Sequence, residues 1–81
     1  MKIAADKRLF WFLKDDVELD LDIPSVLDMY VQQVLSRGIS QDVKVLFERI
    51  GALQVKEVFM RVKSFLPKEV RLFWEDYFGN T

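Results

Sequence analysis

The sequence predicts an all-α fold: a compact orthogonal bundle of four or five short helices, forming one domain over residues 1–81. Apolar residues recur at helical spacing along most of the chain, and proline and glycine stand where these segments begin and end. The clearest segment is residues 22–38, where Pro24 suits a first helical turn and Gly38 suits a left-handed residue after the last turn. We therefore expect residues 24–37 to form the central helix.

The N-terminal segment, residues 4–13, is expected to form a short helix with Asp6 near its start. Its five consecutive apolar residues, 9–13, cannot all face one core, because each residue turns about 100° around the helix axis. At least one of Phe10, Trp11 and Phe12 should therefore point away from the core.

Residues 15–23 alternate between acidic and aliphatic side chains, which predicts an extended connector with its aliphatic side on the core. The spaced carboxylates resemble a calcium-binding loop only superficially. If Asp16 is loop position one, Leu21 replaces the required glycine and Leu27 replaces the bidentate glutamate. We expect Asp22 or Ser25 to help cap the central helix.

Three more helices are expected after Gly38, over residues 41–50, 54–65 and from Pro67 to about Gly79, with Ser40 as the N-cap of the first. Their expected inward faces are, in order, Val43, Leu46, Phe47 and Ile50; Val55, Val58, Phe59, Val62, Phe65 and Leu66; and Val70, Phe73, Trp74 and Tyr77.

The composition argues against several classes of function. The chain has no Cys and no His, which removes thiolate metal sites, the commonest metal ligand and the usual general base. We therefore expect no enzymatic activity, no cofactor and no metal site. The net charge of −1 favours neither nucleic acid nor a membrane surface, and the longest apolar run is too short to span a bilayer. A cytoplasmic location is the expectation.

One alternative is a helix-turn-helix nucleic-acid binder formed by residues 41–50 and 54–65. Its phosphate contacts would come from Lys56, Arg61 and Lys63. Bulky Phe47 and charged Glu57 stand where that motif usually has a small and an apolar residue. Nucleic-acid binding is therefore the less favoured alternative.

The apolar content favours a protein partner. Hydrophobic residues make up 51% of the chain, with seven Phe, two Tyr and two Trp, a large apolar load for so small a domain. Large aromatic anchors dominate interface energies. We expect the partner-binding residues to be Phe10, Trp11 and Phe12, with Trp74 and Phe78 as a neighbouring aromatic group. A homodimer that pairs this surface with itself, or coverage by the chain's own segments, are the alternatives.

Four short motifs follow one another along the chain: L-F-W at 9–11, V-L-S-R-G at 34–38, D-V-x-x-L-F at 42–47 and L-P-K-E-V-R-L-F-W at 66–74. In this order they resemble a family of small uncharacterised bacterial helical domains, often encoded beside nucleotidyltransferase-like toxins of the abortive-infection type. The resemblance implies an antitoxin-like or accessory role through protein–protein contact, with no catalytic residues.

Overall fold

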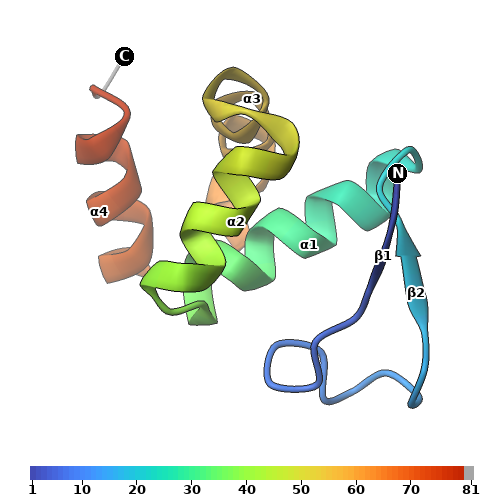
Figure 1. Ribbon diagram of the computed structural model, residues 1–81. Coiled ribbons are helices and arrows are strands. Elements are labelled where there is room, and N and C mark those ends of the chain that lie inside the picture. Colours follow the sequence, from blue (N-terminus) through green and yellow to red (C-terminus); the bar gives the residue numbers. More distant parts are fainter. Residues whose placement is uncertain (80–81) are drawn as a thin grey trace.

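The computed structural model describes residues 1–79. Its elements, in chain order, are β1 (Lys2–Ala4), β2 (Glu18–Asp20), α1 (Pro24–Arg37), α2 (Ser40–Ile50), α3 (Ala52–Val62), the 3₁₀ turn η1 (Lys63–Phe65) and α4 (Lys68–Tyr77). The fold is mostly helical, as predicted (Figure 1). It is not purely all-α, because β1 and β2 form a small antiparallel sheet with Ile3 opposite Leu19.

Helix α1 is the central helix, as the sequence predicted. It packs against α2, α3, α4 and β2, and the other helices are arranged around it (Figure 1). Its buried residues recur at helical spacing and form one apolar face: Leu27, Tyr30, Val31, Val34 and Leu35. No side chain caps its N-terminus, so the predicted caps Asp22 and Ser25 are wrong.

Gly38 closes α1 by a different mechanism from the one predicted. Its φ is −72°, so it does not adopt the left-handed conformation. A Cβ at this position would lie 2.6 Å from the carbonyl oxygen of Val34, so a close backbone approach is what requires glycine here. Gly51, between α2 and α3, does have a positive φ of 84°.

The predicted helix over residues 4–13 is wrong: Ala4 belongs to β1, and residues 5–13 follow the strand as a series of turns. The carboxylate of Asp6 accepts the backbone N–H of Arg8, a local bond that competes with helix formation. Turns also let Leu9 and Phe10 enter the core while their neighbours point outward, as the run of five apolar residues required. The extended connector is confirmed in part, because β2 occupies its middle and buries Leu19.

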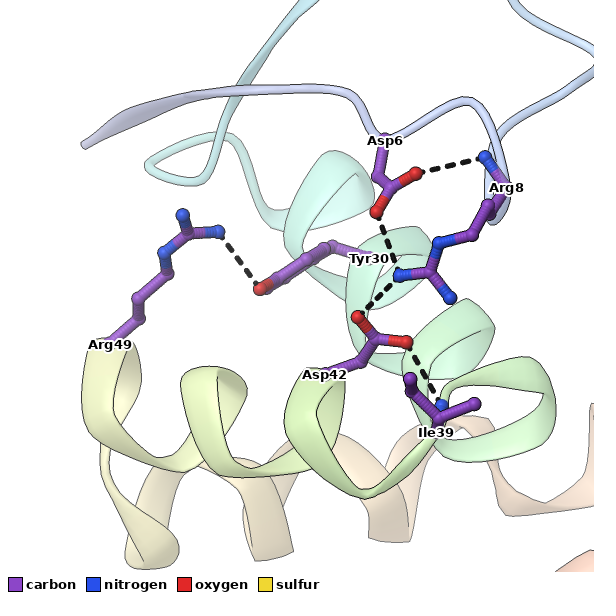
Figure 2. Close-up of polar contacts among 6 residues, drawn as sticks. All are labelled: Asp6, Arg8, Tyr30, Ile39, Asp42 and Arg49. Carbon is purple, nitrogen blue, oxygen red and sulfur yellow. Dashed lines mark hydrogen bonds and ion pairs between the residues drawn. The ribbon is translucent and has the colours of Figure 1, made fainter.

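Residues 1–17, which we call the N-terminal arm, are fastened to the helices by polar contacts (Figure 2). The Arg8 guanidinium donates to Asp6 at 2.9 Å and to Asp42 at 2.7 Å. The second carboxylate oxygen of Asp42 accepts the backbone N–H of Ile39 at 2.9 Å, which caps α2. The N-cap is thus Ile39, and the predicted N-cap, Ser40, is the first helical residue.

Arg8 and the Ile39 N–H together lower the pKa of Asp42, Arg8 having the larger effect. A single carboxylate therefore both caps α2 and holds the arm. Gln33 of α1 adds a second attachment, donating to the carbonyl oxygen of Leu9 at 2.7 Å.

The last two helices lie close to their predicted ranges. Helix α3 ends at Val62, and the tighter turn η1 rotates Phe65 out of the expected inward face, leaving it 71% exposed. Leu66 is extended, with φ −88° and ψ 148°, as expected for a residue before proline.

We predict that Asp42→Asn destabilises the domain at about pH 6 and has a smaller effect at about pH 2.5. The lowered pKa means that ionised Asp42 stabilises the fold above its unfolded pKa of about 3.9, and this stabilisation is lost as the pH falls through the folded pKa. Urea unfolding at both pH values measures the difference. The effect at pH 6 should shrink in an Arg8→Ala background, and equal effects in both backgrounds would contradict the contact.

We also predict that Phe10→Ala costs about 3–5 kcal/mol of unfolding free energy, because the ring is 1% exposed and packs beside Tyr30. The matched control is Phe12→Ala, where the ring is 53% exposed, with an expected cost below about 1 kcal/mol. Denaturant unfolding of both variants tests this, and similar costs would show that the arm packs differently.

Candidate functional site

An apolar groove with a volume of about 870 Å³ lies between α2 and α4. The two helices run in the same direction, as Figure 1 shows. Apolar side chains line it. Ile39, the N-cap of α2, lies with Val43 and Phe47 of α2 on one side, and Leu35 of α1 also contributes. The other side consists of α4 residues: Val70, Phe73, Trp74 and Tyr77. We call this surface the α2–α4 groove.

The groove consists largely of residues that the sequence pattern predicted to face inward. On α4 only Trp74 is buried, whereas Phe73 is 61% and Tyr77 60% exposed. On α2 only Leu46 is buried, and Val43 and Phe47 are partly covered. The prediction that Phe73 and Tyr77 are core residues is therefore wrong, because no segment among residues 1–79 covers that side of α4.

Trp74 is the fixed base of the groove. The carbonyl oxygen of Leu35 has lost its usual helical partner, because the N–H of Ile39 donates to Asp42 instead. The indole N–H of Trp74 donates to this carbonyl at 3.1 Å. The ring of Phe47 stacks beside Trp74, with centroids 6.4 Å apart, and meets Tyr77 edge-on at 6.0 Å. Aromatic contacts of this kind hold the groove residues in defined positions.

The charged residues that line the groove are Lys44, Glu48 and Glu69. All three are exposed, which places their charged groups at its rim. Among residues 1–79 no group of three or more acidic residues could hold a metal ion. The chemistry available in the groove is burial of apolar side chains, with charge pairing at the edge.

Of the predicted partner-binding residues, Phe10 is a core residue and does not reach the surface. Trp11 and Phe12 are more than half exposed, and the Arg37 guanidinium lies 4.7 Å from the Trp11 ring. Trp74 is 6% exposed at the groove base.

The prediction that Trp74 and Phe78 lie beside the aromatic residues 10–12 is also wrong. Among residues 1–79, Phe10, Trp11 and Phe12 form ring pairs with one another and with Tyr30. The rings of Trp74 and Phe78 pair instead with Phe47, Phe59, Phe73 and Tyr77. The N-terminal arm and α4 lie on opposite sides of the molecule in Figure 1.

The alternative nucleic-acid residues have acidic neighbours within the chain. Arg61 pairs with Asp28 at 2.7 Å, and this contact raises its pKa. Lys63 pairs with Glu75 at 3.4 Å. Lys56 is partly buried and also interacts with another group. The positive charges that would face phosphate are thus partly neutralised. No helix within residues 1–79 is long and apolar enough to cross a membrane.

A smaller crevice of about 330 Å³ lies between the N-terminal arm and helices α1 and α2. Its polar groups already have partners: Asp42 pairs with Arg8, and the Tyr30 hydroxyl accepts a bond from Arg49 at 3.2 Å (Figure 2). The α2–α4 groove is therefore the stronger candidate site.

We predict that Trp74→Phe lowers the unfolding free energy by about 1–3 kcal/mol, because the Leu35 carbonyl loses its donor and the smaller ring leaves space. Phe73→Ala, at the neighbouring exposed ring, should cost less than about 1 kcal/mol. Denaturant unfolding measures both, and a larger cost for Phe73→Ala would contradict the assignment of Trp74 as base and Phe73 as wall.

The chain matches no protein-family model, no curated protein and no solved structure. The candidate site is therefore defined by its geometry and chemistry alone. The site is an open apolar groove between two parallel helices, with an aromatic base and a charged rim.

Proposed function

We propose that this domain is a protein–protein interaction module and that the α2–α4 groove is its contact surface. The observation that carries the proposal is the groove of about 870 Å³, with Phe73 and Tyr77 more than half exposed along it. Exposed apolar surface of this kind is typical of interaction sites, and aromatic residues are its usual anchors. The residues first expected to form the contact, Trp11 and Phe12, lie outside this groove.

The other functions receive less support. A nucleic-acid contact through Arg61 and Lys63 would have to compete with their ion pairs to Asp28 and Glu75. An enzymatic role would have to use neither His nor Cys, since the chain has none. A homodimer through the groove is the remaining competitor, and it differs from a partner complex in its dependence on the domain's own concentration.

A narrower proposal concerns the partner's identity. The sequence resemblance implies an antitoxin-like partner of a nucleotidyltransferase-type toxin, and the groove would then be the surface that contacts the toxin. Co-expression with the product of the neighbouring gene tests this. Relief of toxicity by the wild-type domain, but not by Phe73→Ala, is the expected result, and equal relief by both would argue against the groove.

We predict that Phe73→Ala weakens the partner complex at least about tenfold, because it removes a central aromatic anchor. The domain is immobilised and exposed to an extract of the cells that make it. Proteins retained by the wild-type domain are then purified, and their affinity for the wild type and for Phe73→Ala is measured by calorimetry.

Phe65→Ala is the matched control, because Phe65 is 71% exposed and lies outside the groove. It should bind like the wild type. A reconstituted complex that is equally strong with Phe73→Ala would show that the groove is not the contact surface.

A further inference from the structure

We infer that the occupant of the α2–α4 groove is a short amphipathic helix of the partner protein, with basic residues at both ends of its apolar stripe. This inference rests on the proposed function and specifies the chemistry of the partner. Three features support it: the helical walls of the groove, its length and the positions of its acidic side chains.

The walls favour a helix over an extended peptide. Both walls are α-helices, whose backbone groups are bonded internally along most of their length, so the groove offers no strand edge to pair with. The sheet edge of β1 and β2 lies on the far side of the molecule from α4 (Figure 1). An extended peptide would bury unpaired backbone N–H and C=O groups against apolar side chains, whereas a helix satisfies its own.

The length of the groove matches a helix of about three turns. Helix α2 has 11 residues and α4 has 10. At about 1.5 Å per residue, each wall is roughly 15 Å long. At the same rise, a helix of about 10–12 residues would span this length and present apolar residues at i, i+3, i+4 and i+7.

The acidic side chains lie towards opposite ends of the groove. The ring of Phe47 contacts Tyr77, which places the adjacent Glu48 towards the C-terminal end of α4. Glu69 is in the first turn of α4, at the other end. Lys44 lies one helical turn before Glu48 and gives the centre of the rim its positive charge.

An occupant complementary to this rim has Lys or Arg near each end of its apolar stripe. Complementary rim charges contribute mainly to selectivity and to the rate of association. The apolar stripe would provide most of the affinity, and the flanking bases would discriminate between helices of similar apolar content.

The test uses two synthetic peptides of about 14 residues, long enough at the same rise per residue to span the groove and to carry a flanking residue at each end. They share one leucine stripe at i, i+3, i+4 and i+7 and differ only in Lys or Glu at both flanks. A third peptide is the Lys version with a central proline that breaks the helix. Fluorescence anisotropy of labelled peptides measures their affinities for the wild type, Phe73→Ala and a Glu48→Gln, Glu69→Gln double variant. The double variant changes two exposed residues and should fold normally.

The Lys peptide should bind the wild type about tenfold more tightly than the Glu peptide, an order-of-magnitude expectation for two rim charges. The gap should close in the double variant and at high salt. The proline peptide should bind at least about tenfold more weakly than its parent, and Phe73→Ala should weaken the Lys peptide to a similar degree.

The other outcomes separate this inference from the proposed function. Equal binding of the Lys and Glu peptides, still dependent on Phe73, would overturn the inference about charge and leave the groove as a contact surface. Undiminished binding of the proline peptide would overturn the helical occupant. Peptide binding that is unchanged by Phe73→Ala would overturn the inference, and so would the absence of any peptide binding. If sedimentation then showed a dimer that requires Phe73, the occupant would be a second copy of this chain.

Discussion

The burial of α1 on several sides is the constraint on which the rest of the structure depends. Val31 and Val34 are almost completely buried, and α2, α3, α4 and β2 all pack against this one helix. In so small a domain, most apolar side chains of the surrounding elements are used in contacts with α1. Few then remain for contacts between those elements. Two neighbours can therefore both pack on α1 and still leave a gap between them, and the α2–α4 groove is that gap.

A few directional hydrogen bonds determine where each neighbour sits on α1. Apolar contact is non-directional, so burial alone would allow several arrangements of similar energy. Trp74 donates to the Leu35 carbonyl and fixes α4, while Gln33 donates to the Leu9 carbonyl and fixes the N-terminal arm. The pair of Arg8 and Asp42 then ties the arm to the start of α2. Each bond joins segments that are distant in sequence. The Trp74 bond positions one wall of the groove, and the other two bonds position the N-terminal arm.

The candidate site follows from this arrangement and from the aromatic content of the C-terminal half. The same ring cluster that stabilises α4 on its inner side presents Phe73 and Tyr77 on its outer side. The many apolar side chains expected from the composition therefore lie partly in the core and partly at the surface. This division is the observation on which the proposed contact with a protein partner rests.

The sequence by itself determined the four helices after residue 23, the central position of α1 and the extended residues around β2, because apolar periodicity and proline reflect local backbone geometry. It also indicated a surplus of aromatic residues and placed their surface at Phe10, Trp11, Phe12, Trp74 and Phe78. Trp11 and Phe12 are exposed, whereas Phe10 and Trp74 are buried and Phe78 is partly buried. Only the tertiary structure decided which apolar residues are covered. Periodicity shows that a side chain favours leaving water, whereas its burial depends on which distant segment packs over it.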